Sequence, residues 1–91
     1  MKYEDIKNWE WYEPIIDKII LDAIEYEKQS SGFGHLSCAR AQKISNKNLP
    51  YIATLIEKLK ELKYIDEMQH TIITKEEFEH IINARKQQTQ N

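Results

Sequence analysis

The sequence has few of the residues that interrupt, cross-link or anchor a chain. Its 91 residues include two glycines and two prolines, so a mostly helical chain with few marked turns is expected. The single cysteine excludes an internal disulfide and fits a reducing cytoplasm. No apolar run approaches the ~20 residues of a membrane-spanning helix, and the Met1 end lacks the pattern of an export peptide. We therefore expect a cytoplasmic protein without a membrane partner.

Charge is plentiful but unevenly distributed. Charged residues make up 31% of the chain, and the formal net charge is −2. Residues 1–29 carry four lysines against eight acids, whereas residues 30–63 carry six basic residues against two acids, net +4. Such asymmetry can build a basic face on an acidic protein. A solvated helix surface with scattered lysines explains the same charges equally well.

Length and apolar spacing predict one domain over residues 1–91. Residues 1–13 form an aromatic N-terminal extension, and residues 86–91 a frayed polar tail. A helix is expected from Pro14 to about Lys28, with an apolar stripe over more than half of its circumference. That stripe is wider than one small core needs, which indicates a second buried surface such as a partner subunit.

Three further helices are marked by capping residues. Ser37 can cap a short helix, and Asn48 can cap a longer one over about residues 49–63. Thr74 and Glu77 match a capping box that begins the last helix. Between the last two helices, the stretch "YIDEMQHTIIT" predicts two short strands around a tight turn.

This order of elements resembles the winged helix-turn-helix superfamily. The run "IEKLKELKYIDE" is similar to the end of the recognition helix and the start of the first wing strand. The run "IITKEEF" is similar to the second wing strand and the start of the closing helix. The resemblance covers roughly residues 36–82. Within the superfamily, the pattern is most similar to that of MarR-, ArsR- and PadR-type regulators. It implies a mainly α fold with a small two-stranded antiparallel β-wing.

Two local features depart from the family pattern. Lys63 occupies the position of the usual helix-terminating glycine, where a left-handed non-glycine residue costs roughly 1 kcal/mol. The turn "SNKNLP" before the recognition helix looks longer than the usual three or four residues.

The resemblance implies a sequence-specific double-stranded DNA-binding transcription regulator that reads the major groove with the helix at about 49–63. Asparagine pairs with adenine, threonine contacts the thymine methyl, and lysine or tyrosine holds phosphate. Asn46 and Asn48 are equally well explained as turn and cap residues, and Glu57 and Glu61 on the same face oppose phosphate. The candidate DNA-contacting residues are Arg40, Lys43, Asn46, Lys47, Asn48, Tyr51, Thr54 and Lys58.

A protein partner is the second hypothesis. Surplus apolar and aromatic surface predicts a homodimer, which suits the reading of a palindrome. The alternative function is a protein–protein adaptor or accessory protein, in which tryptophan and tyrosine side chains supply the binding hot spots. The candidate dimer or partner interface comprises Trp9, Trp11, Tyr12, Ile15, Ile19, Phe78 and Ile82.

Catalytic and metal chemistry find little support in the sequence. His35 and Cys38 form one close H-x-x-C pair, whereas a structural zinc site usually has four ligands in two close pairs. No Ser-His-Asp or Cys-His arrangement can be argued. We expect neither an enzyme nor a metal or other cofactor.

Overall fold

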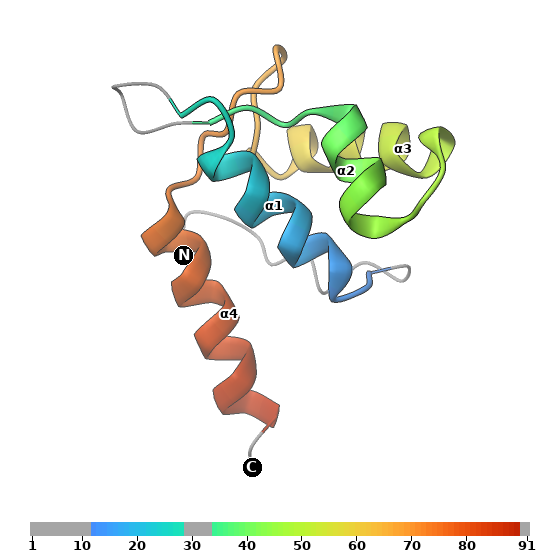
Figure 1. Cartoon of the computed structure of the whole chain (residues 1–91). Coiled ribbons are helices and arrows are strands. Elements are labelled where there is room, and N and C mark those ends of the chain that lie inside the picture. Colours follow the sequence, from blue (N-terminus) through green and yellow to red (C-terminus); the bar gives the residue numbers. More distant parts are fainter. Residues whose placement is uncertain (1–11, 29–33, 90–91) are drawn as a thin grey trace.

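The computed structural model describes residues 12–28 and 34–89, with the backbone alone described for residues 85–89. Its helices are α1 (Ile15–Glu25), α2 (Cys38–Ser45), α3 (Leu49–Glu61) and α4 (Lys75–Thr89). The first three lie together, while α4 leads away from them (Figure 1). The prediction of a mainly helical chain is confirmed, and α4 includes part of the tail that was expected to fray. None of the described helices is long and apolar enough to cross a membrane.

The predicted two-stranded β-wing is wrong. Within the described residues no β-strand forms, and the expected wing segment contributes two isolated antiparallel bridges, Ile65 with Thr71 and His35 with His70. Only Tyr64 and Ile65 are left to pair with the residues after the turn, because Lys63 ends α3 with a left-handed φ of 66° and the turn begins at Asp66, whose carbonyl accepts from the Gln69 N–H. The fold is therefore four helices with a short turn before α4, and the winged helix-turn-helix class does not describe it.

The helix ends follow the predicted capping residues. The Ser37 hydroxyl accepts from the Arg40 N–H at 3.3 Å, and Asn48 Oδ1 accepts from the Tyr51 N–H at 3.1 Å. Thr74 and Glu77 exchange both hydrogen bonds of a capping box. Each contact satisfies a backbone donor that the first turn of a helix leaves unpaired. The sequence therefore specified where α2, α3 and α4 begin.

Helix α1 provides the centre of the core. Its buried residues are Ile16, Ile19, Ile20, Ala23 and Ile24. Helix α2 and helix α4 both pack against α1, so the chain itself covers most of the wide stripe. The apparent surplus of apolar surface on this helix thus gives no evidence for a partner subunit.

Gly34 is where the segment before α2 crosses the end of α1. Its amide donates to Thr71 Oγ1 at 2.8 Å, and its carbonyl accepts from the Thr71 N–H at 3.0 Å. A Cβ atom at this position would lie 2.1 Å from the Ala23 carbonyl oxygen and 2.3 Å from the Ile24 carbonyl oxygen. Both neighbours are backbone atoms, so they cannot move aside cheaply.

We predict that Gly34→Ala lowers the free energy of unfolding by about 2 kcal/mol, the scale of an overpacked core. Urea unfolding followed by circular dichroism would measure the change. Ala39→Ser, at an exposed position of α2, serves as the control and should change stability by less than about 0.5 kcal/mol. Equal stability of the Gly34→Ala variant and the wild type would contradict the close approach.

Lys63 ends α3 in the strained conformation expected from the sequence. Its φ is 66°, the left-handed region that favours glycine. The Tyr64 N–H donates to the Leu59 carbonyl, and the Lys63 N–H donates to the Lys60 carbonyl. These are the two hydrogen bonds of a Schellman motif. The side chains of Tyr64 and Leu59 are both buried in the core, so the motif fixes how the chain leaves α3.

We predict that Lys63→Gly raises the free energy of unfolding by about 1 kcal/mol, because glycine adopts this conformation without a Cβ clash. Glu57→Gly, at an exposed position in the interior of α3, should instead lower it by about 1 kcal/mol. Thermal and urea unfolding of the two variants would measure both changes. A destabilising Lys63→Gly substitution would show that the lysine side chain contributes more than the strain costs.

Candidate nucleic-acid interface

Helices α2 and α3 are joined by a turn of three residues, 46–48. Asn46 ends α2 with a left-handed φ of 57°, and Asn48 caps α3. The turn is therefore shorter than the sequence indicated, because Ser45 belongs to α2 while Leu49 and Pro50 belong to α3. Helices α2 and α3 pack against each other, and we call these two helices and their turn the α2–α3 unit.

Arg40 ties this unit to α1. Its Nε lies 3.0 Å from Asp22 Oδ2, and its Nη2 donates to Asp22 Oδ1, so the ion pair is bidentate. The guanidinium also lies over the Tyr26 ring, 4.4 Å from the centroid. The hydrogen bonds to Asp22 raise the pKa of Arg40 above its usual value. Arg40 was predicted to hold the DNA backbone, and here it clamps α2 to α1.

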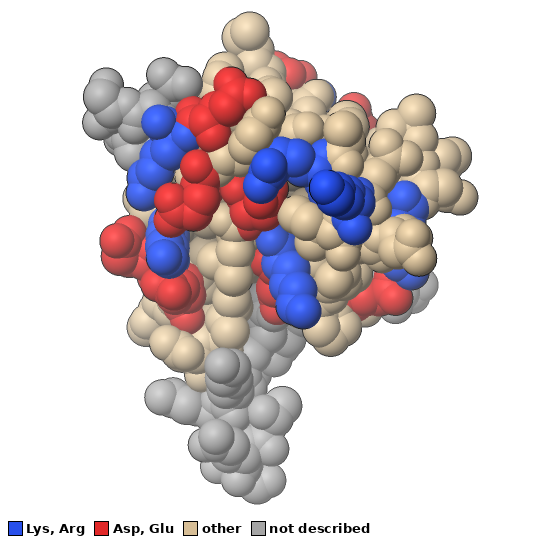
Figure 2. Space-filling model, in the orientation of Figure 1, with Lys and Arg blue, Asp and Glu red and all other residues tan. Residues whose placement is uncertain are grey.

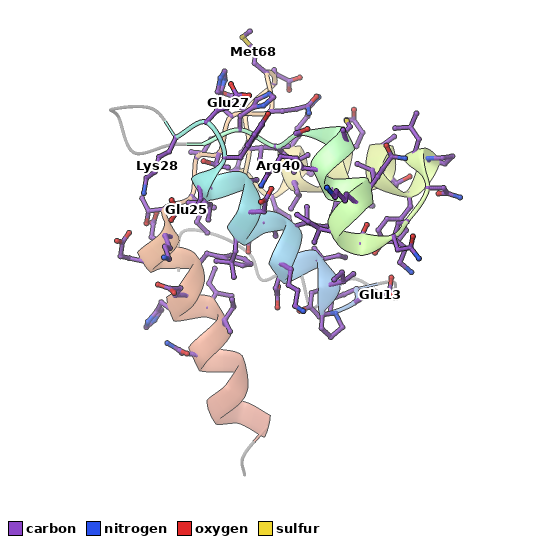
Figure 3. The ribbon with its side chains drawn as sticks, viewed as in Figure 1. Glu13, Glu25, Glu27, Lys28, Arg40 and Met68 are labelled. Carbon is purple, nitrogen blue, oxygen red and sulfur yellow. The ribbon has the colours of Figure 1, made fainter. Side chains whose placement is uncertain are left out.

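Lys47 and Tyr51 both bind the carboxylate of Glu13. Lys47 Nζ lies 3.3 Å from Glu13 Oε1 and 3.1 Å from Oε2, and the Tyr51 hydroxyl donates to Oε2 at 3.0 Å. The Lys47 ammonium also lies 5.1 Å from the centroid of the Tyr51 ring. We call these three residues the Glu13 clasp. Figure 3 shows Glu13 just before α1, on the side where α2 turns into α3.

The clasp shifts the pKa of two of its members. The hydrogen bond from Lys47, followed by that from Tyr51, lowers the pKa of Glu13 below its ordinary 4.5. Burial, together with the hydrogen bond to the negative carboxylate, raises the pKa of Tyr51 to about 12. At neutral pH, Glu13 is therefore ionised and Tyr51 keeps its proton, which is the pairing that the geometry requires.

The other candidate DNA contacts are more open to solvent. Lys43 is exposed and Lys58 is half-buried, and neither has an ion pair among the described residues. Thr54 is exposed, and its hydroxyl donates to the Pro50 carbonyl, as expected for a threonine within a helix. Asn46 is exposed at the end of α2. These side chains all come from one short unit, residues 43–58.

Acidic residues limit the basic character of this surface. Glu57 and Glu61 are exposed on α3, and Lys60 lies 3.8 Å from both Glu57 and Glu67. Figure 2 shows basic side chains interleaved with acidic ones on the face that carries α1 and α2. A partner held by charge would therefore contact Lys43 and Lys58 more readily than the paired cations.

The structure buries some residues of the predicted partner interface and leaves others partly accessible. Ile19 and Phe78 are 1% and 0% exposed in the core, so they present no surface to a partner. Tyr12, Ile15 and Ile82 are half-buried and keep that role as a prediction. Trp9 and Trp11 lie outside the described residues.

Histidine and cysteine do not gather into a metal centre within the described ranges. The His35 ring lies against that of His70, with centroids 5.3 Å apart. No cluster of three or more metal-ligating side chains occurs in residues 12–28 and 34–89. Cys38 is a half-buried free thiol at the start of α2.

Comparisons with known proteins add no identification: no protein-family model, no curated protein and no solved structure matches this chain. The resemblance of residues 36–82 to the regulators named above therefore stays a prediction from the sequence, without the wing that the structure corrects.

The sequence did not reveal the importance of Glu13, which is the last residue of the predicted N-terminal extension. The residue lies 34 positions before Lys47 and 38 before Tyr51, so no local spacing reveals the contact. The one signal in the sequence was the opposite net charge of the segments 1–29 and 30–63.

We predict that the Glu13 clasp makes the protein less stable in acid. Because the folded-state pKa of Glu13 is lowered, its stabilisation is complete above about pH 4.5 and is lost as the pH falls through the folded-state value. The stability difference between wild type and Glu13→Gln should therefore shrink between pH 7 and pH 3. Urea unfolding at several pH values would measure it, with Lys47→Ala expected to lose the same pH dependence. A constant difference would contradict the clasp.

Proposed function

We propose that this protein binds double-stranded DNA through the α2–α3 unit and acts as a sequence-specific transcription regulator. The single observation that carries the proposal is the three-residue turn between two packed helices, with exposed polar and basic side chains around the start of the second. In this arrangement the N-terminal half of α3 faces the major groove, and the residues that flank it contact the backbone. The setting we propose is the cytoplasm, where Cys38 stays reduced.

The described side chains have distinct parts in this proposal. Thr54 presents its methyl group to a thymine, since its hydroxyl is occupied by the Pro50 carbonyl. Asn46 is the exposed amide available for a base edge or a phosphate. Lys43 and Lys58 neutralise phosphates. Asn48 keeps its capping role, so it serves α3 rather than the DNA.

A homodimer fits the same proposal, because two identical reading helices match a palindromic site. Ile82 supports such an interface, since it lines with Leu21 an open hollow of about 380 Å³ between α1 and α4. Titration of duplex at high protein concentration would give two chains per site for a dimer and one for a monomer.

We predict that Lys43→Ala and Lys58→Ala weaken binding to all duplexes alike. Each should also flatten the dependence of log K on log salt by about 0.9, because one phosphate contact is lost. Thr54→Ala should instead cost about 1 kcal/mol on a site selected from random sequences and little on unrelated DNA. Fluorescence anisotropy at several salt concentrations measures both quantities.

Lys75→Ala is the matched control, since Lys75 lies on α4 and pairs with Glu25 at 3.7 Å. It should leave both affinity and salt dependence unchanged. Equal losses from Lys75→Ala and Lys58→Ala would show a diffuse charge effect in place of a binding site. Failure of the wild type to retain duplex at about 50 mM salt would overturn the proposal, because even non-specific binding is strong there.

The adaptor hypothesis is supported by one separate observation. Met68 is 73% exposed at the tip of the turn before α4, directly after the exposed acids Asp66 and Glu67. Figure 3 shows Met68 pointing away from the rest of the molecule. An acidic tip with an exposed apolar side chain suits a basic protein partner. This function becomes the preferred one if duplex binding is absent.

A further inference from the structure

We propose that Lys47 and Tyr51 form a binding site for a backbone phosphate of duplex DNA, and that Glu13 occupies this site in the free protein. The inference rests on the proposed function and adds a regulatory feature to it. Glu13 would compete with the DNA, so the chain limits its own affinity.

The donors of the clasp suit phosphate as well as carboxylate. Lys47 supplies an ammonium group and Tyr51 a neutral hydroxyl, and both donate to anionic oxygen atoms of Glu13. The same two donor types commonly hold phosphate oxygens in protein–DNA complexes. The position of the ammonium beside the Tyr51 ring keeps the two donors together. A phosphodiester could therefore take the place of the carboxylate without a change of partners.

The clasp also lies where a DNA backbone would pass. Lys47 precedes the capping residue of α3, and Tyr51 belongs to the first turn of this helix. The N-terminal end of a helix carries a partial positive charge and attracts anions. In the proposed binding mode, this end of α3 enters the major groove between two phosphate backbones. The Glu13 carboxylate thus holds a position that phosphate would otherwise fill.

Exposure makes the exchange feasible. The side chains of Lys47 and Glu13 are 34% and 43% exposed, and ion pairs this open to solvent stabilise a protein only weakly. The Arg40–Asp22 pair differs, because it is bidentate and its aspartate is only 22% exposed. We therefore assign the exchange to Glu13 and a lasting structural role to Asp22.

The test compares two substitutions that change the net charge equally. Glu13→Gln opens the clasp, while Glu25→Gln removes an exposed carboxylate at the far end of α1, which pairs with Lys28 and Lys75. Glu13 and Glu25 are both labelled in Figure 3. Full-length wild type and both variants are titrated against labelled duplex by anisotropy at salt concentrations from about 50 to 200 mM. Circular dichroism at the same pH confirms that all three are folded.

Glu13→Gln should tighten duplex binding about two- to fivefold, the range expected from an exposed ion pair. It should also steepen the salt dependence by up to about 0.9, since Lys47 then neutralises a phosphate without first leaving Glu13. Glu25→Gln should change the affinity less than about twofold.

Three results would count against the proposals. Equal tightening by both substitutions would show a general charge effect and overturn the competition. Unchanged affinity of Glu13→Gln, with duplex still bound by the wild type, would overturn the competition and leave the proposed function standing. Absence of duplex binding by all three proteins would overturn both.

Discussion

The burial of α1 is the constraint on which the rest of the structure depends. The apolar stripe of this helix gives α2 and α4 their packing surface, and Gly34 crosses its end at a distance that leaves no room for a Cβ atom. Two carboxylates, one on α1 and one just before it, hold the α2–α3 unit. Asp22 binds Arg40 of α2, and Glu13 binds Lys47 and Tyr51 around the start of α3. Packing and charge thus fix α2 against α1, while the Glu13 contacts tie the start of α3 to the residue just before α1.

This arrangement explains the uneven charge of the sequence. The acidic N-terminal third and the basic middle third attract each other within one chain, so part of the positive charge already has a partner. In a protein that binds DNA, internal ion pairs of this kind lower the non-specific affinity for any polyanion. Each phosphate contact then requires that a carboxylate first leave its lysine or arginine partner, which offsets part of the free energy gained. In the proposed binding mode, Lys43 and Lys58, which have no ion pair among the described residues, would supply the sequence-independent part of binding.

Local features could be predicted from the sequence, and long-range ones could not. The caps of α2, α3 and α4 depend on side chains within three residues of the helix start. The left-handed conformation of Lys63 could be predicted because this position corresponds to the residue that usually ends such a helix. The prediction of a two-stranded wing was wrong. The apolar residues of this stretch do not reveal that the turn at Asp66–Gln69 leaves only single bridges on either side of it. The width of the α1 stripe was misread, since amphipathicity shows how much surface is apolar but not which neighbour covers it.

In the proposed competition, Glu13 weakens DNA binding mainly by holding Lys47, its charged partner. A double-mutant cycle of duplex affinity tests it most directly, using wild type, Glu13→Gln, Lys47→Ala and the double variant at one salt concentration. If Glu13 occupies the phosphate site, Glu13→Gln should tighten binding in the wild-type background and tighten it clearly less once Lys47 is alanine, because only the Tyr51 hydroxyl then remains for Glu13 to occupy. An equal gain in both backgrounds would contradict it, because Glu13 would then act through its charge alone.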